Sequence, residues 1–308
     1  MPPVTVRVPA STANLGSGYD AFGLALARYD RFTADFAPEG EWRVAVTGEG
    51  ESGARQGRDN LVAVAMRRVF AEVGERRGAS VACENGIPFG RGLGSSSAAI
   101  VGGLCAANRL TGSSLSAADI FRLAAELEGH PDNVAAALSG GFTICWGEHG
   151  ASRMTHIDPP AGLAAVCVIS EQRLSTRHSR GMLPDQVPHA DAAFDVGRAG
   201  LLAAGIALGR RDLIGAGMWD RLHEPYRAVA IPDLETVRAI LLDAGADGAA
   251  LSGAGPTVIG LVGGSDDADA LERAREIARR ASGPLARCDG RLAPEAVAID
   301  RDGAVVAD

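Results

Sequence analysis

The amino-acid sequence predicts an α+β fold in two domains. Strand-like segments are mixed with helix-like segments, and the two kinds do not alternate regularly as they do in βαβ units. The chain has 308 residues, more than one typical domain, and 46% of them are hydrophobic, which is enough for a sizeable core. We place the domain boundary near residue 155, so that the predicted domains are residues 1–155 and 156–308.

The predicted strands are short segments in which apolar residues alternate or run together. In chain order they are residues 4–10, 32–37, 42–47, 80–84, 142–147, 163–170 and 257–263. The predicted helices repeat apolar residues at helical spacing. In chain order they are residues 60–77, 98–110, 116–129, 130–139, one or more within 191–217, 233–246 and 267–281. Gly140 and Gly141 supply the stop of the fourth helix.

Composition narrows the function classes. The formal net charge of −8 excludes a general basic surface, so we expect neither a nucleic-acid nor a membrane partner. The five cysteines are scattered, without a C-x-x-C pair, which is typical of a reducing cytoplasm. The N-terminus lacks the apolar segment of a signal peptide, and no stretch approaches the ~20 apolar residues of a membrane span. We therefore expect a cytoplasmic protein.

The most informative segment is PFGRGLGSSS, residues 88–97. Its glycines stand at alternate positions and allow close backbone approach, and its serines stand where a helix N-cap is favoured. Converging N–H groups at a helix N-terminus suit phosphate. The segment lacks the lysine of a Walker loop and the last glycine of a dinucleotide fingerprint. A lone turn of this kind is more often a tight turn with a serine N-cap, but two further segments accompany this one.

Three segments together carry a family resemblance. Residues 9–26 (PASTANLGSGYDAFGLAL), 88–99 (PFGRGLGSSSAA) and 251–260 (LSGAGPTVIG) resemble, in order and spacing, the three motifs of the GHMP kinases. Among these, NLGSGYD and ELEGHPDN are similar to the homoserine kinases, whereas mevalonate kinases carry a lysine in the first motif and galactokinases an arginine-rich version. Residues 171–192 and 220–232 also resemble the C-terminal half of homoserine kinases.

The resemblance implies a two-domain GHMP kinase fold with the active site in the cleft between the domains. It implies transfer of a phosphoryl group from ATP to the hydroxyl of L-homoserine, with Mg²⁺ as cofactor, as a step of threonine biosynthesis. It also suggests a homodimer. The alternatives are a GHMP kinase with a mevalonate-like or sugar acceptor, or a ligand-sensing relative without catalysis. Intact Ser96 and Glu128 argue against the sensor.

The resemblance also implies an ATP site. Asn60 reads the edge of adenine, with Leu61 and Val62 beside it, although Asp59 or Asn60 also suits a helix N-cap. The glycine-rich segment would bind the phosphates through Pro88, Phe89, Gly90, Arg91, Gly92, Leu93, Gly94, Ser95, Ser96, Ser97 and Ala98. Gly253–Pro256 of the third motif would support this loop. Ser96 and Glu128 would hold Mg²⁺, since a hydroxyl and one carboxylate leave room for water and phosphate.

Homoserine carries a carboxylate, an ammonium group and a hydroxyl, and its site needs a partner for each. By resemblance, Asp20 binds the ammonium group and Asn14 the polar end of the substrate. Arg180 and Arg227 would bind the carboxylate as fork-shaped donors. Arg177 rivals Arg180, because the sequence fixes the register of this segment poorly.

The hydroxyl end of the substrate would be lined by His130 and Asn133. Mevalonate kinases use an aspartate at the position that aligns with Asn133, and an amide does not accept a proton in the same way. A loose phosphoryl-transfer transition state needs little deprotonation, so positioning by Asn133 is chemically sufficient. Asp132 is the competing base; its other role is to complement the dipole of the following helix.

Overall fold

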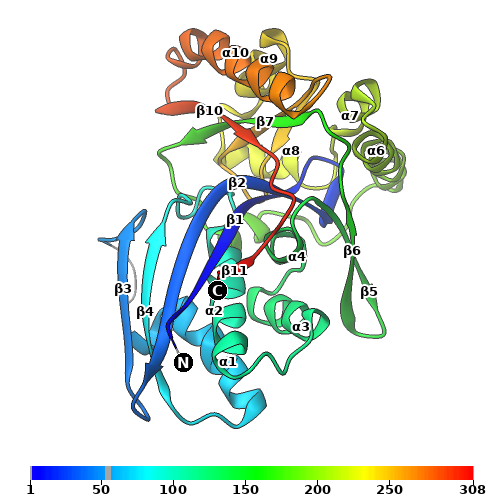
Figure 1. Ribbon diagram of the computed structural model, residues 1–308. Coiled ribbons are helices and arrows are strands. Elements are labelled where there is room, and N and C mark those ends of the chain that lie inside the picture. The colour runs from blue at the N-terminus through cyan, green and yellow to red at the C-terminus, as the bar shows by residue number, and fades with distance from the viewer. Residues whose placement is uncertain (1, 53–56, 308) are drawn as a thin grey trace.

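The protein, in a computed structural model that describes residues 2–52 and 57–307, has two β-sheets with helices packed against each (Figure 1). Both parallel and antiparallel pairing occur, and helices are interspersed with strands along the chain. This confirms the predicted α+β fold. None of the helices within the described residues is both long enough and apolar enough to cross a membrane.

The first sheet is organised around one very long strand. Its strands are β1 (Val4–Asn14), β2 (Gly18–Ala37), β3 (Trp42–Gly48), β4 (Gly78–Asn85), β5 (Phe142–Glu148), β6 (Ala151–Ile157) and β11 (Val305–Ala307). The order is β11-β1-β2-β4-β3, and β5 joins β2 and β6 to one side. Because β2 has 20 residues, its two halves pair with different neighbours: Phe22–Leu24 with β5, and Asp30–Ala37 with β4.

Four helices accompany the first sheet: α1 (Leu61–Val73), α2 (Ser95–Leu110), α3 (Ala117–Glu128) and α4 (Asp132–Ser139). Two glycines without side chains let helix α2 pack closely, Gly102 against the sheet and Gly103 against α1. A Cβ at Gly102 would stand 2.2 Å from the ring of Phe32, and one at Gly103 would stand 2.6 Å from Val62 O in α1. Close packing therefore fixes the N-terminus of α2 relative to β1 and β2.

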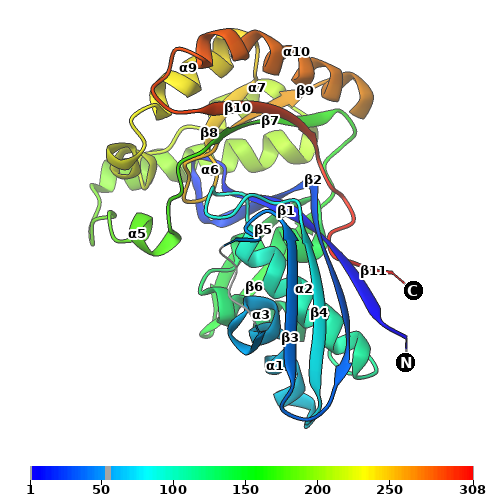
Figure 2. The ribbon, with the colours of Figure 1, turned by 90° about the vertical axis from the view of Figure 1, so that its left-hand side faces the viewer.

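The second sheet has the order β10-β7-β9-β8 and is antiparallel throughout. Its strands are β7 (Leu163–Ser170), β8 (Gly248–Leu251), β9 (Val258–Gly263) and β10 (Leu292–Ala298). Its helices are α5 (Thr176–Arg180), α6 (His189–Leu208), α7 (Arg211–Gly217), α8 (Glu224–Arg227), α9 (Leu234–Ala244) and α10 (Asp267–Leu285). Figure 2 shows α9 and α10 on the face of this sheet that is turned away from the first sheet.

The two sheets do not divide the chain into two continuous halves. Residue 155, where we place the domain boundary, lies inside β6, which pairs with β5 up to Ile157. The second sheet begins at β7, and the chain returns at its end to the first sheet, where β11 pairs with β1. The division into 1–155 and 156–308 stays a prediction about domains.

Candidate active site

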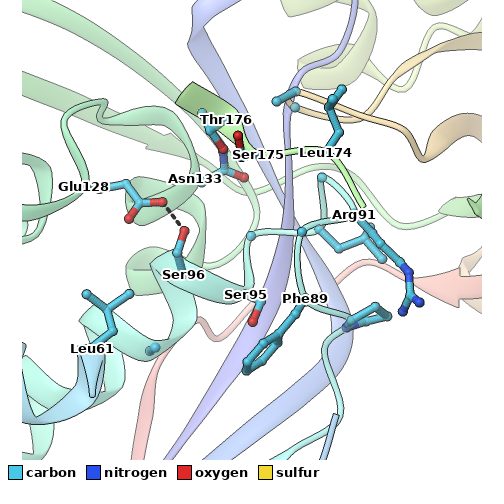
Figure 3. A pocket seen from close by; sticks show the side chains of 18 of the residues that line it. Leu61, Phe89, Arg91, Ser95, Ser96, Glu128, Asn133, Leu174, Ser175 and Thr176 are labelled. Atoms are coloured by element: carbon cyan, nitrogen blue, oxygen red, sulfur yellow. Dashed lines mark hydrogen bonds between the residues drawn. The ribbon is translucent and has the colours of Figure 1, made fainter. Parts of the chain in front are cut away.

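A cavity of about 520 Å³ lies where the first and third sequence motifs meet the glycine-rich segment. This volume is typical of a site for a small ligand. The residues predicted to bind ATP, substrate or metal line it, apart from Ser97 and Ala98, which are buried in α2 beside it. Figure 3 shows the cavity, with Leu61 and Phe89 toward one end and Asn133 and Thr176 toward the other. The predicted residues therefore gather in one place.

The glycine-rich segment forms a loop that ends at an uncapped helix. Gly90, Gly92 and Gly94 have φ of 65°, 76° and 71°, in the left-handed region that favours glycine. Gly94 is the N-cap of α2, with no side-chain capping bond. The expected serine N-cap is therefore absent, and Ser95–Ser97 lie in the first turn instead. The first N–H groups of the helix face the cavity end without a capping side chain, which suits an anion.

The third motif holds this loop in place. Ser252, which precedes Gly253, donates from Oγ to Gly92 O at 2.6 Å, and a Cβ on Gly92 would stand 2.2 Å from Ser252 O. The N–H of Thr257 donates to Arg91 O at 3.4 Å, and that of Leu174 donates to Gly90 O at 2.9 Å. The loop is thus braced from the second sheet, as the motif's predicted supporting role requires, and Gly253 to Gly255 also line the cavity.

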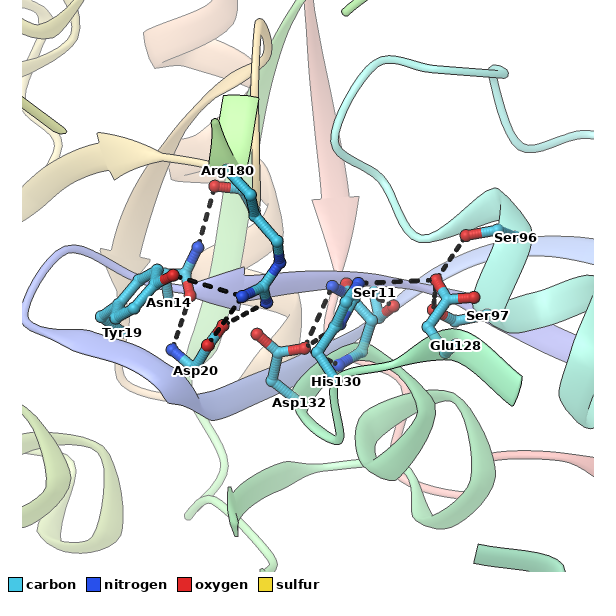
Figure 4. A network of polar contacts seen from close by, with 12 residues as sticks. Ser11, Asn14, Tyr19, Asp20, Ser96, Ser97, Glu128, His130, Asp132 and Arg180 are labelled. Carbon is cyan, nitrogen blue, oxygen red and sulfur yellow. Dashed lines mark hydrogen bonds and ion pairs between the residues drawn. The ribbon is translucent and has the colours of Figure 1, made fainter. Parts of the chain in front are cut away.

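Glu128 lies beside the start of α2. It is the last residue of α3, and its side chain is only 9% exposed. Its Oε1 accepts a short hydrogen bond from Ser96 and one of 2.9 Å from Ser97 (Figures 3 and 4). His130 Nε2 lies 3.8 Å from the same oxygen. A carboxylate and a hydroxyl, both hard oxygen ligands, therefore stand together at the phosphate end of the cavity.

His130 and Asp132 form a second polar group next to Glu128. His130 Nδ1 and Asp132 Oδ1 are 2.7 Å apart, and Asp132 Oδ1 also accepts from the backbone N–H of Asn133 at 2.8 Å. Burial lowers the pKa of His130, but the hydrogen bond and charge of Asp132 and the charge of Glu128 outweigh it, so the pKa is raised overall. The two neighbouring carboxylates thus favour the protonated form of His130.

The amide of Asn133 is oriented by a residue that sequence reasoning missed. Ser11, fully buried in β1, donates from Oγ to Asn133 Oδ1 at 3.0 Å. Because the amide oxygen is thereby engaged, the NH₂ group is turned toward Asp132 Oδ1, at the long distance of 3.5 Å. Asn133 therefore has donor capacity to offer toward the cavity that it lines.

On the side of Asp132 and His130 away from Glu128, the charged residues Asp20 and Arg180 form a two-point ion pair (Figure 4). Asn14, with φ of 68°, makes two hydrogen bonds within the protein: Oδ1 accepts from Asp20 N at 3.0 Å, and Nδ2 donates to Gly253 O at 2.9 Å. Arg180 lines the cavity, whereas Arg177 is exposed and does not. The register that the sequence left open therefore places Arg180 at the site.

Comparison with known proteins agrees with this geometry. Residues 60–141 match the family profile "GHMP kinases N terminal domain", and residues 194–282 match "GHMP kinases C terminal". A homoserine kinase of Moorella thermoacetica is 43% identical over 255 residues, 82% of this chain and 86% of that protein. One of Streptomyces coelicolor is 44% identical over 274 residues, 87% of each chain.

The chain belongs to the homoserine kinase family of GHMP kinases. The crystal structure of a homoserine kinase from Cytophaga hutchinsonii is similar over 99% of this chain and 97% of that one, with a TM-score of 0.87 and 28% identity. Membership of this ATP-using family confirms the GHMP kinase fold that the three motifs imply.

Within this GHMP kinase fold, the predicted adenine residues stand at the start of α1. Asn60 is the N-cap, and its Oδ1 accepts from Val62 N at 3.0 Å, so the N-cap interpretation of this residue is correct whatever else it binds. The cavity wall nearby includes Phe89, Val46 and Cys83. An apolar wall beside an amide suits a purine ring.

Other residues that line the cavity of this GHMP kinase fold were not among the predicted site residues. Leu174, Ser175 and Thr176 come from the segment that leads into α5, and they reach the cavity only because Leu174 binds the loop at Gly90. Asp30 also lines the cavity. Its Oδ1 accepts hydrogen bonds from two backbone N–H groups, those of Gly86 and Ile87. Only the tertiary fold brings these residues to the site.

Proposed function

We propose that this member of the family is a homoserine kinase, which transfers the γ-phosphoryl group of ATP to L-homoserine to give O-phospho-L-homoserine in threonine biosynthesis. One observation carries the proposal. The cavity that is lined by the glycine-rich loop is also lined by an acid and two arginines, Asp20, Arg180 and Arg227. A nucleotide phosphate site and a site for a zwitterion therefore share one cavity.

The charges match those of an amino acid. The substrate's ammonium group suits Asp20, and its carboxylate suits Arg180 and Arg227. The pair between Asp20 and Arg180 can exchange for substrate contacts with the total charge conserved, because a zwitterion supplies both signs. Mevalonate lacks the ammonium group and a sugar lacks both charges, so neither would complement the acid and the two arginines together. Asn14 would act indirectly, by holding the backbone at Asp20.

The residues at the phosphate end fit Mg²⁺. Ser96 and Glu128 offer one hydroxyl and one carboxylate, and the described residues contain no cluster of three or more His, Cys, Asp or Glu side chains arranged to hold a metal. Such a sparse set suits Mg²⁺, which keeps several water and phosphate ligands. When bound, Mg²⁺ would neutralise charge on the phosphates. The glycine-rich loop and the N-terminus of α2 would hold the phosphates, and Asn60, Leu61 and Val62 the adenine.

The acceptor hydroxyl would be positioned without a dedicated base. Asn133 can donate to it while Ser11 fixes the amide. Asp132 Oδ1 already contacts His130 and accepts from the N–H of Asn133, so this oxygen is engaged within the protein. Because the transition state is loose, orientation and electrostatics can supply most of the rate. Asp132 as a base is the competing hypothesis.

A coupled ADP-release assay tests the proposal. Homoserine, serine, mevalonate and galactose should be compared at saturating ATP and magnesium, and homoserine should have the highest kcat/KM. A preference for mevalonate or galactose would contradict the substrate assignment. If the protein binds homoserine but forms ADP with none of the four acceptors, the result would instead indicate a ligand sensor. The homodimer that the resemblance suggests stays a prediction, which light scattering can check.

A further inference from the structure

A buried histidine contacts the arginine that we assign to the substrate carboxylate. His223 immediately precedes α8 and has no exposed surface. Its Nδ1 lies 3.0 Å from Arg227 Nη1, and its Nε2 lies 2.9 Å from the carbonyl oxygen of Gly16 in the first motif. The ring therefore bridges the turn between β1 and β2 and the helix that carries Arg227.

The two contacts determine which ring nitrogen carries the proton. A carbonyl oxygen only accepts, so Nε2 must carry a hydrogen that it donates to Gly16 O. A guanidinium only donates, so Nδ1 must be bare and accept from Arg227. Both hydrogen bonds are satisfied together only when His223 is neutral, with its hydrogen on Nε2.

The surroundings of His223 support this neutral form. Burial lowers the pKa of His223 to about 4; the charge of Asp220 raises it, and the charge of Arg227 lowers it. Asp220 Oδ1 lies 3.7 Å from Nε2, and Asp20 acts in the same direction from β2. The ring of Tyr19 stacks on the imidazole of His223, with 5.2 Å between the two ring centres. Desolvation and Arg227 together thus outweigh the two carboxylates.

Arg227 is held by uncharged acceptors. Its Nη1 donates to His223 and, at 3.0 Å, to Gly253 O, and its Nε is buried without a hydrogen-bond partner. Arg227 as a whole is only 2% exposed yet lines the cavity, with its Cζ 5.5 Å from the centre of the Tyr19 ring. Burial lowers the pKa of Arg227. A carboxylate in place of His223 would neutralise this cation, whereas a neutral acceptor orients it and leaves its charge for a ligand.

We propose that His223 is a positioning residue: its bare Nδ1 fixes the guanidinium of Arg227 in the orientation that binds the carboxylate of the amino-acid substrate. The inference rests on the proposed function for the role of Arg227. It adds a residue that touches neither substrate nor nucleotide and acts on the affinity for one substrate alone.

Two substitutions test the roles of the two ring nitrogens of His223 separately. In His223→Asn the side-chain oxygen can stand near the position of Nδ1 and still accept from Arg227. In His223→Gln the amide reaches the position of Nε2 and keeps the bond to Gly16, but the acceptor for Arg227 is lost. We expect His223→Gln to raise the homoserine KM roughly tenfold, with the ATP KM and kcat nearly unchanged. His223→Asn should restore most of the homoserine affinity.

Equal effects of the two substitutions, or equal changes in the KM of ATP and homoserine, would overturn the proposal. Arg227→Lys provides the second arm, and it should raise the homoserine KM more than the ATP KM. In the Arg227→Lys background, His223→Gln should raise the homoserine KM little further, because both substitutions disrupt the same contact between His223 and Arg227. If Arg227→Lys leaves the homoserine KM unchanged, the proposed role of Arg227 fails. If Arg227→Lys raises it but His223→Gln does not, only the role of His223 fails.

Nitrogen NMR of the unsubstituted protein tests the same point independently of how well the variants fold. The chain has six histidines. With ¹⁵N-labelled histidine, the His223 signals, assigned by their loss in His223→Asn or by contacts to Tyr19, should show a hydrogen on Nε2 alone at pH 7. The Nδ1 shift should change when homoserine binds. A protonated ring, or a hydrogen on Nδ1, at pH 7 would exclude the proposed role.

Discussion

Asp20 Oδ2 and Oδ1 lie 2.9 and 2.5 Å from Arg180 Nη1 and Nη2, so that a residue of the first motif and a residue of α5 close a two-point ion pair across the cavity (Figure 4). About a third of each side chain is exposed. An ion pair at such an exposed site adds little to stability, so its partners can be exchanged at low cost. The pair therefore suits a site that takes up and releases a charged ligand.

The first prediction concerns this pair. Arg180→Gln should raise the homoserine KM by about 10- to 100-fold and change the ATP KM much less, because the amide cannot bind a carboxylate with two charged donors. Steady-state kinetics with each substrate varied separately measures this. Arg177→Gln is the matched control, since Arg177 is exposed on the same short helix and lies outside the cavity. An equal effect of both substitutions would contradict the assignment of Arg180.

The second prediction concerns the magnesium ligand. Glu128→Gln should lower kcat by orders of magnitude and raise the magnesium concentration needed for half-maximal rate, because a neutral amide is a poor ligand for Mg²⁺. The thermal shift on adding Mg²⁺ and an ATP analogue should also shrink, which gives a readout that does not depend on turnover. Glu126→Gln, on the same helix but paired with Arg122 at the surface, is the control. Normal turnover of Glu128→Gln at limiting magnesium would reject this ligand.

The third prediction separates the two hypotheses for the hydroxyl. Asp132→Asn should keep most of kcat, because its oxygen can still accept from the N–H of Asn133. It should lose about 0.3–1 kcal/mol of stability if the carboxylate complements the dipole of α4. Asn133→Leu should lose kcat with little change in ATP binding, since no donor remains to orient the hydroxyl. Activity must be normalised to folded protein, because Asn133→Leu also leaves Ser11 without its acceptor.

The same pair of substitutions also has a contrary outcome. A loss of about a thousandfold in kcat in folded Asp132→Asn protein would make Asp132 the base. The acidic limb of kcat/KM for homoserine would then also change in this variant, after allowance for the titration of ATP and magnesium. With no base, Asp132→Asn leaves the acidic limb in place.

The fourth prediction concerns the pH dependence of stability at Asp30, which is 1% exposed at the cavity wall. Burial raises the pKa of Asp30 to about 7, although the N–H groups of Ile87 and Gly86 favour the ionised form. The folded state therefore holds this proton more tightly than the unfolded chain. Its contribution to stability is complete below the unfolded pKa and is lost as the pH rises toward 7.

Asp30→Asn removes this titration and keeps an oxygen acceptor for both N–H groups. The melting temperature of Asp30→Asn minus that of the unsubstituted protein should therefore be larger at pH 8 than at pH 5, by several degrees. Asp35→Asn, at a partly exposed position of the same strand, is the control for the change of charge. A difference that is the same at both pH values would show that Asp30 does not titrate in this range.

The sequence predicts elements well where local signals agree with burial. Asn60 caps α1 as its residue type favours. The helix ends at Val73, earlier than the predicted Arg77, because Gly74 takes a left-handed conformation and donates to Phe70 O. Strand β10 was not predicted, since Pro294 interrupts its pattern; proline is tolerated there because β10 is an edge strand.

Site residues can be predicted from the sequence where one contiguous motif contains both the glycines that form a turn and the residues that bind the ligand. The residues of the glycine-rich loop reach the cavity because they are contiguous. Ser11 and His223 were not predicted as site residues, since their roles depend on contacts with Asn133 and Gly16 that are distant in sequence. Thr176 was not predicted either, although it lines the cavity. The serine N-cap was wrong because Gly94, in a left-handed conformation, already starts the helix.

The return of β11 to β1 also bears on how the protein is made. Residues 305–307 follow the other strands of the first sheet in the chain, so the edge of β1 stays without this neighbour while those strands are being made. An open strand edge is a template for pairing with other chains. During translation the nascent chain therefore exposes an aggregation-prone edge, which β11 closes only after the strands of both sheets have been made.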